Sequence, residues 1–270
     1  MRSVVSEHSI GVFDSGVGGL SVLRSLREEL PHENFVYVAD SGHAPYGERD
    51  DGYVVDRSRA ITDYLITRHR IKALVIACNT ATAAAIHILR RQHPTLPIIG
   101  VEPALKPAVA ASATHRIGVM ATRGTLSSSK YTTLLASLHG QAEFVSQACD
   151  GLAHAVEHDD TTKTIALCTH YISQMGPFGT QSGQIDTLVL GCTHYAFAGT
   201  HLRTLVGPAV HILNTGEPVA KRTRHVLAAC LSQRQDEGSC SFETSGAPAQ
   251  LQAAVQRWLQ LPAPVRDLPK

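Results

Sequence analysis

The chain has 270 residues, of which 43% are hydrophobic, and a formal net charge of +1. This length is sufficient for a sizeable core and favours two domains of about 100 to 150 residues over one. A near-neutral charge without Lys/Arg runs, and no apolar stretch of the ~20 residues that span a bilayer, exclude an obvious nucleic-acid or membrane protein and favour a small-molecule partner.

The first predicted unit is a strand, a glycine-rich turn and a helix. IGVFDSG (10–16) is an apolar strand that runs into glycines, and SVLRSLREEL (21–30) has apolar residues at helical spacing. NFVYVADSGHAPYG (34–47) predicts a second strand and a loop. The next predicted elements are a helix over 54–69, a buried strand over 72–78 and a helix over 81–92. This alternation predicts a parallel sheet with polar residues at the carboxyl ends of its strands.

The second part of the chain repeats the first. RIGVMATRGT (116–125) is similar to SIGVFDSGVG, and TLVLGCTHYA (187–196) is similar to ALVIACNTAT. In each half about 70 residues separate the opening glycine from the strand-terminal cysteine, a spacing natural for a duplicated domain. Residues 208–231 predict a strand and a helix, and residues 238–246 a strand before a final helix and a proline-rich tail. We expect this last portion to complete the first sheet.

The predicted fold is therefore α/β. We expect two similar domains, each a mainly parallel sheet flanked by helices, related by pseudo-twofold symmetry with the active site between them. The first domain is predicted to contain residues 1–100 and 208–270, and the second residues 101–207. Such a duplication could bring one cysteine from each half face to face.

The cysteines are sparse and contain no C-x-x-C pair, so we expect free thiols in a reducing compartment. Two of them, Cys78 in IACNTA and Cys192 in LGCTHY, each end an apolar strand and open a polar turn. Cys168 lies in a second CTHY, but its flanks place Ile165, Cys168, Ile172 and Met175 on one helical stripe, which is typical of a packed helix. Cys78 and Cys192 are therefore the candidate functional thiols.

A thiol between a strand and a helix meets the free N–H groups and the positive end of the helix dipole, which favour the thiolate. Lowering a thiol pKa from ~8.5 to about 7 takes roughly 2 kcal/mol, within reach of such a site. The alternative for either cysteine is a buried structural residue.

The loop DSGVGGLS (14–21) could present its backbone N–H groups to a carboxylate, with Asp14 and Ser15 projecting from the strand end. It does not match a dinucleotide fingerprint, because Ser21 stands where the third glycine would be, and a P-loop lysine is missing. The alternative is that the glycines only permit a tight turn. Tyr46 and Gly47 lie in a second loop at a strand end.

The motifs FDSGVGGLSVL, PYGER, VIACNTATA, GVEPALKPA, GVMATRGT and LVLGCTHY together resemble the bacterial glutamate racemases of the cofactor-independent aspartate/glutamate racemase superfamily. The resemblance implies interconversion of L- and D-glutamate without a cofactor, which supplies D-glutamate for peptidoglycan, cell wall biogenesis and cell shape. It assigns Cys78 to the D-glutamate side of the α-carbon and Cys192 to the L-glutamate side. Inverting a stereocentre by proton transfer requires a base on one face and an acid on the other, so one cysteine alone could not do it.

The resemblance also implies the residues that contact the substrate or assist the thiols. Asp14 is expected to assist Cys78, and His194 to assist Cys192. The expected substrate contacts are Asp14, Ser15, Tyr46, Gly47, Asn79, Thr80, Thr193 and His194. We expect no metal, because the fifteen histidines do not suggest a Cys/His ligand set.

Two segments depart from the family pattern. The family often has ACP-x-F-V-P-L-V-E, with a glutamate that supports the second cysteine, where this chain has ACDGLAHAVE (148–157). Glu157 stays in register and is either functional or a solvated helix carboxylate. NTGEPVA (214–220) replaces an Asp-Ser-Gly segment. Both changes bear on fine specificity and regulation more than on the reaction.

Several alternatives remain open from the sequence. The same chemistry could act on aspartate or a related amino acid, the chain could be a non-catalytic glutamate-binding protein, or one thiol could serve a hydrolase or transferase. Family members form homodimers in more than one geometry, and the sequence does not choose among them. Because about nine residues precede the first strand, we expect no activation by a peptidoglycan precursor through an N-terminal extension. The start MRSVVSEHSI lacks a signal-peptide layout, so the expected localisation is cytoplasmic.

Overall fold

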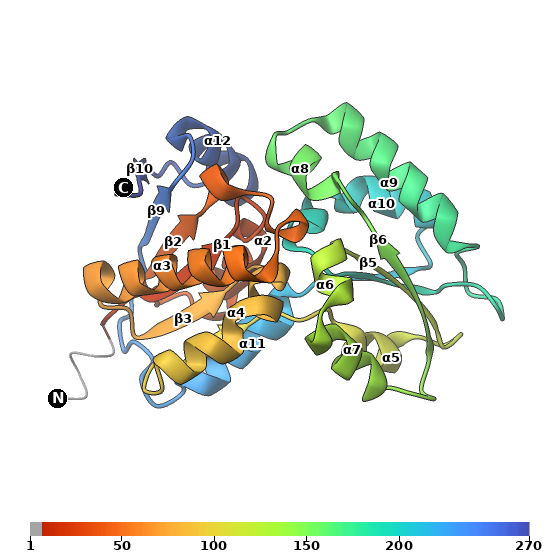
Figure 1. The fold of residues 1–270 in the computed structure, drawn as a ribbon, viewed down its shortest axis with the longest axis horizontal. Helices are drawn as coiled ribbons and strands as arrows, with labels where there is room; N and C mark the ends of the chain where they lie inside the picture. Colours follow the sequence, from red (N-terminus) through yellow and green to blue (C-terminus); the bar gives the residue numbers. More distant parts are fainter. Residues whose placement is uncertain (1–6, 270) are drawn as a thin grey trace.

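The computed structural model describes residues 7–269, and the strands in this range form two parallel sheets, one of six strands and one of four. Figure 1 shows the two sheets beside each other, each with helices packed around it. The strand orders are β10-β9-β2-β1-β3-β4 and β6-β5-β7-β8. The predicted α/β class is confirmed. Within residues 7–269, no helix combines the length and the apolar character that a membrane crossing requires.

The first sheet is built from both ends of the chain. Its strands are β1 (Ile10–Asp14), β2 (Phe35–Ala39), β3 (Ala73–Ile76), β4 (Ile98–Gly100), β9 (Cys240–Thr244) and β10 (Val265–Asp267). The helices around it are α2 (Leu20–Glu29), α3 (Asp51–His69), α4 (Asn79–Gln92), α11 (Gly216–Leu227) and α12 (Pro248–Leu259). The expectation that the last part of the chain returns to this sheet is met by β9 and β10.

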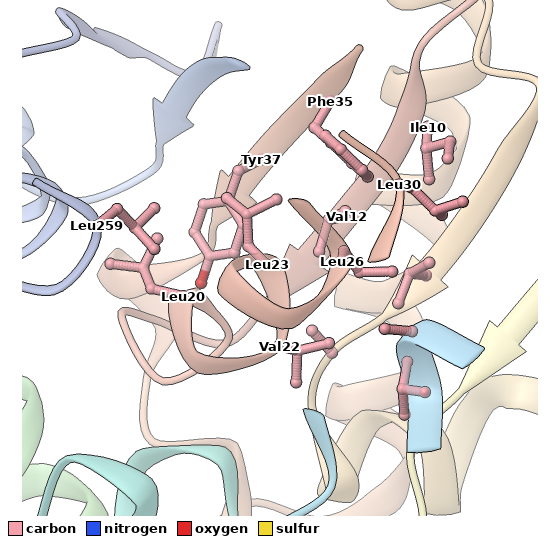
Figure 2. Packing of buried hydrophobic residues seen from close by; sticks show 14 of the residues in the cluster. Ile10, Val12, Leu20, Val22, Leu23, Leu26, Leu30, Phe35, Tyr37 and Leu259 are labelled. Atoms are coloured by element: carbon pink, nitrogen blue, oxygen red, sulfur yellow. The ribbon is translucent and has the colours of Figure 1, made fainter. Parts of the chain in front are cut away.

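The two faces of this sheet follow from strand alternation. In β1, Ile10 and Val12 pack in the cluster that contains α2, α11 and α12, while Phe13 packs in the cluster of α3 and α4. Figure 2 shows the first of these clusters, with Leu23 of α2 beside the sheet and Leu259 arriving from the last helix. Burying one such leucine contributes about 1.5–3 kcal/mol.

The second sheet is formed by β5 (Arg116–Ala121), β6 (Glu143–Ala148), β7 (Thr187–Leu190) and β8 (His211–Leu213). The helices of this half are α5 (Leu105–Ala111), α6 (Arg123–Ser127), α7 (Ser129–Ala136), α8 (Leu152–Glu157), α9 (Thr161–Met175) and α10 (Gly199–Val206). The described residues also contain the short 3-10 helices η1 (Ser41–His43), η2 (Tyr46–Glu48) and η3 (Thr193–Ala198).

The register of the strands supports a duplication. Ile10 is paired with Phe35 and Ala73 in the first sheet, as Ile117 is paired with Phe144 and Thr187 in the second. The fourth strands also correspond, because Leu74 pairs with Ile98 and Leu188 pairs with Ile212. The order β2-β1-β3-β4 is therefore repeated as β6-β5-β7-β8.

This repeat corrects one part of the predicted organisation. The sequence predicts the strand after residue 207 in the first domain, but β8 pairs with β7 in the second sheet. The physical reason is that β8 is the counterpart of β4. As β4 pairs with β3 in the first sheet, β8 pairs with β7 in the second. We propose to keep the two-domain division with the second boundary after β8.

Helix α9 also corrects a detail. Cys168, Ile172 and Met175 are buried on it as predicted, but Ile165 is 41% exposed, and Thr164 takes its place on the buried stripe. Cys168 lies in the apolar core of the second half and has no part in the site described below.

Candidate active site

A pocket with about 440 Å³ of empty space, including its open mouth, lies where the carboxyl ends of the two sheets meet. Both strand-terminal cysteines, Cys78 after β3 and Cys192 after β7, line it. So do most of the other predicted site residues, namely Ser15, Tyr46, Gly47, Asn79, Thr80, Glu157, Thr193 and His194. Asp14 lies behind the lining and is fully buried.

Cys78 is the N-cap of α4 and is 5% exposed. Its sulfur accepts a hydrogen bond from the N–H of Ala81 at 3.4 Å and lies 3.8 Å from the Ser15 hydroxyl. The predicted arrangement of a thiol at a helix N-terminus is therefore present.

The expected lowering of the Cys78 pKa is wrong for this structure. Burial raises the pKa of Cys78, and the nearby Asp14 carboxylate raises it further, against the opposing hydrogen bonds from Ala81 and Ser15. Desolvation of a buried sulfur outweighs one helix terminus here, so Cys78 rests as the protonated thiol.

Cys192 is joined to two further side chains. His194 Nδ1 lies 3.8 Å from the Cys192 sulfur, and His194 Nε2 lies 2.7 Å from Glu157 Oε2. Cys192 is 7% exposed and Glu157 is 5% exposed, so the alternative of a solvated Glu157 is wrong. The three side chains form a connected chain from carboxylate to imidazole to sulfur.

In this series of contacts, the charged forms of Glu157 and His194 stabilise each other. Burial alone would raise the pKa of Glu157, but the hydrogen bond and charge of His194, with donors from Val17 and Ser41, lower it overall. Burial would likewise lower the pKa of His194, but Cys192 and Glu157 raise it well above its usual range. A carboxylate paired with an imidazolium results, and the imidazolium lies beside the Cys192 sulfur.

The glycine-rich loop (14–21) contacts the Glu157 carboxylate and the His194 ring. Val17 N–H donates to Glu157 Oε2 at 2.8 Å, and Gly19 N–H donates to Asp14 Oδ2 at 2.9 Å. A Cβ at Gly16 would overlap the Glu157 carboxylate, and one at Gly18 would overlap the His194 ring. The loop does present N–H groups to carboxylates, as predicted, but they are carboxylates of the protein. Its glycines let two side chains of the second half approach.

Asp14 ends β1 beneath the pocket. Its second oxygen lies 3.5 Å from the Thr193 hydroxyl. Burial raises the pKa of Asp14 to about 6, opposed by the charge of His194 and reinforced by that of Glu157. Asp14 therefore titrates close to neutral pH and influences Cys78 through its charge.

Asn79 offers polar atoms toward the pocket. It is 4% exposed, and neither its amide nitrogen nor its amide oxygen has a hydrogen-bond partner. Leaving such a buried group unpaired costs about 1–3 kcal/mol, which a polar ligand would recover. Thr80 Oγ1 lies 3.1 Å from Thr122 Oγ1, across the two halves.

The Tyr46 hydroxyl is not directed at a ligand. It donates to Asp40 Oδ2 at 2.5 Å, and Arg57 donates to both Asp40 oxygens, at 2.9 and 2.8 Å. Ser245, which follows β9, also donates to Asp40. This network fixes the loop, so Tyr46 and Gly47 can offer a ligand their backbone more readily than the phenol.

Sequence reasoning missed several lining residues, chiefly Thr122, His154 and His158. Thr122 could have been found from the repeat, because it occupies the position in GVMATRG that Ser15 occupies in GVFDSGV. His154 and His158 are exposed at the rim and stack with ring centroids 4.1 Å apart. Across residues 7–269, three or more His, Cys, Asp or Glu side chains are nowhere grouped to hold a metal ion.

Comparison with known proteins places this geometry in context. Residues 10–222 match the family model described as Asp/Glu/Hydantoin racemase. A glutamate racemase of Methylococcus capsulatus is 46% identical over 250 residues, covering 91% of this chain and 89% of that protein. A glutamate racemase of Pseudomonas aeruginosa is 41% identical over 251 residues, covering 92% of each chain.

Solved structures give the same result. The crystal structure of glutamate racemase isoform RacE1 from Bacillus anthracis has a TM-score of 0.86 and 30% identity, covering 98% of both chains. Escherichia coli glutamate racemase, solved with L-glutamate and the activator UDP-MurNAc-ala, has a TM-score of 0.82 and 27% identity, covering 97% of this chain and 98% of the other.

Proposed function

The chain belongs to the Asp/Glu/hydantoin racemase family, and from this premise we propose that it is a glutamate racemase that uses Cys78 and Cys192 as its two proton carriers. The observation that carries the proposal is that the strand-terminal cysteines of both repeats line one pocket, together with the buried, unpaired amide of Asn79. An inversion by proton transfer uses a base on one face of the carbon and an acid on the other, and two thiols can fill these roles in either direction.

On the L-glutamate side, Cys192 is the base. The imidazolium of His194 stabilises its thiolate, and Glu157 holds the imidazolium through a 2.7 Å contact. The thiolate removes the α-proton. Because both flanking groups are buried, the charge pair is shielded from water and acts more strongly than it would at the surface.

On the opposite face, Cys78 gives its proton to the carbanion-like centre. Burial and Asp14 keep Cys78 in the thiol form that this step needs. The reaction from D-glutamate starts from the form that the forward reaction leaves, with Cys78 as the thiolate and Cys192 as the thiol. Cys78 removes the α-proton, with Ser15 and the Ala81 N–H stabilising its thiolate, and Cys192 gives its proton to the carbanion-like centre.

The transition state needs preorganised donors, because an amino-acid α-proton is far less acidic than a thiol. Asn79 and Thr80 on one side and Thr193 on the other supply them in this proposal, with the backbone of Tyr46 and Gly47. Each ~1.4 kcal/mol of added stabilisation is worth tenfold in rate. No cofactor takes part in these steps.

The proposed biological role is the supply of D-glutamate for peptidoglycan, and thereby for cell wall biogenesis and cell shape, by a cytoplasmic enzyme. A homodimer is compatible with this role, and contact with nucleic acid or membrane is not required for it.

The test is to incubate the purified chain with L- or D-glutamate in D2O, following optical rotation and loss of the α-proton signal. We expect both enantiomers to converge on the racemate with α-deuterium, and L- and D-aspartate to react at least tenfold more slowly. Faster reaction with aspartate would change the substrate assignment. Absence of both racemisation and exchange would rule out a racemase and leave a binding protein or a hydrolase or transferase that uses one thiol.

A further inference from the structure

Helix α12 carries two different stripes of side chains. Leu251, Val255 and Leu259 are buried in the core of the first half. A second stripe at helical spacing, with Gln250, Ala254, Arg257 and Trp258, lines a crevice together with Val156, Glu157 and Asp159 of the second half. In Figure 1, α12 lies at the edge of the first half nearest to α8.

We propose that this second stripe is a clamp that positions the Glu157–His194 pair over Cys192, so that Gln250, Arg257 and Trp258 are positioning residues for the proton transfer at that thiol. The proposal rests on the function proposed above and assigns residues beyond those that line the pocket. It concerns one thiol only.

Gln250 makes the contact nearest to the pair. Its side-chain nitrogen donates to the backbone carbonyl oxygen of Glu157 at 2.7 Å. Glu157 is the last residue of α8, and the carbonyls of a final turn lack partners within their own helix. Gln250 therefore caps α8 from the other half of the chain and fixes the backbone from which the Glu157 carboxylate extends.

Two further contacts secure the same region. Arg257 forms an ion pair with Asp159, with Nη2 to Oδ2 at 2.6 Å, two residues beyond Glu157. Trp258 stacks on Phe197 with ring centroids 4.2 Å apart, and Phe197 lies in η3, the element that carries His194. Helix α12 thus contacts both the end of α8, which carries Glu157, and η3, which carries His194.

The clamp acts on one side of the reaction. Its contacts reach the segments of Glu157 and His194, whereas Cys78 is surrounded by Ser15, Ala81 and the charge of Asp14. A misplacement of about 1 Å in a catalytic group can cost about 10²-fold in rate. Loosening the clamp should therefore slow transfer at Cys192 more than transfer at Cys78.

Values of kcat/KM alone cannot show that transfer at Cys192 is slowed more than transfer at Cys78. The two enantiomers have equal free energy, so any variant must change kcat/KM equally in both directions. Primary deuterium isotope effects on kcat/KM can reveal it, because [2-2H]-L-glutamate reports transfer to Cys192 and [2-2H]-D-glutamate reports transfer to Cys78.

The experiment compares the double variant Gln250→Ala/Arg257→Gln with Gln252→Ala, an exposed glutamine on the same helix. For the double variant we expect kcat/KM to fall by about tenfold, with the isotope effect rising for deuterated L-glutamate and falling for deuterated D-glutamate. Gln252→Ala should match the wild type. Exchanging the charges, with Arg257→Asp and Asp159→Arg together and Gln250 retained, should restore most of what Arg257→Asp alone loses.

The proposal would be overturned if the rate fell while both isotope effects stayed unchanged, or if Gln252→Ala behaved like the double variant. A second readout does not need turnover: amide hydrogen exchange over residues 152–160 should quicken in the double variant. Trp258 is the single tryptophan of the chain, so its fluorescence should change as well. Unaltered exchange and fluorescence would also refute the clamp, whereas a wild type without racemase activity would refute only the proposed function.

Discussion

His194 Nε2 and Glu157 Oε2 are 2.7 Å apart in a buried contact that links η3 to the end of α8. Both residues are at most 5% exposed, and each stabilises the charged form of the other. A buried ion pair is most costly when one partner is removed. This pair distinguishes the Cys192 side of the pocket from the Cys78 side.

Replacing Glu157 tests the pair directly. Glu157→Gln keeps the shape but removes the charge, so the pKa of His194 should fall and its imidazolium form should support Cys192 less. We expect kcat/KM to fall by about 10²-fold, equally from L- and D-glutamate. Steady-state assays in both directions measure this. A variant within threefold of the wild type would show that Glu157 is structural.

Gly16 tests the close approach of the two halves. In Gly16→Ala the new methyl group overlaps the Glu157 carboxylate, so the carboxylate must move away from His194. We expect activity to fall at least tenfold. Gly199→Ala is the matched control, because a Cβ there has nothing within 4 Å. Equal activity in the two variants would contradict the account of the glycine-rich loop.

Asp14 should give a pH-dependent contribution to stability. Its folded pKa of about 6 lies above the usual 3.8, so the folded state holds the proton more tightly. The stability that protonated Asp14 contributes is present below about pH 4 and is lost as pH rises through about 6. Asp14→Asn should therefore gain stability relative to the wild type between pH 5 and 7.5, by about 1 kcal/mol.

Denaturant unfolding of both proteins at the two pH values measures that gain. A difference that is the same at pH 5 and pH 7.5 would mean that Asp14 titrates outside this range. A control for the loss of one carboxylate is Asp51→Asn at the exposed start of α3.

Tyr46 should matter through Asp40. Tyr46→Phe removes the donor of a buried 2.5 Å hydrogen bond to a carboxylate, so we expect a loss of about 1.5–3 kcal/mol in unfolding free energy. KM should rise as the loop loosens, while kcat stays near the wild-type value. A collapse of kcat with unchanged KM would mean that the hydroxyl acts in the reaction itself.

Much of the site could be predicted from the sequence because it depends on local order. In a parallel α/β pattern, a cysteine that ends a strand lies at the carboxyl end of its sheet. The repeat predicts a second such cysteine at the carboxyl end of the other sheet, opposite the first. Cys78 and Cys192 were identified on that ground. The position of β8 could have been predicted from the same repeat if the fourth strand had been counted.

What could not be predicted depends on packing between distant segments. The burial of Glu157 follows from Gly16 and Val17, which are far away in the sequence, and the raised pKa of Cys78 follows from how much protein surrounds it. The strand β10 in the proline-rich tail has only three residues and forms because β9 offers it an edge. The contacts of α12 likewise need the folded arrangement of both halves.

The most direct test of the central claim is to measure racemisation and α-proton exchange in D2O for Cys78→Ser and Cys192→Ser separately. We expect each variant to lose racemisation by at least about 10²-fold. Cys78→Ser should still exchange the α-proton of L-glutamate, and Cys192→Ser that of D-glutamate. Racemisation that persists in either variant, or exchange of both enantiomers by a single remaining thiol, would contradict a mechanism in which one thiol serves each face.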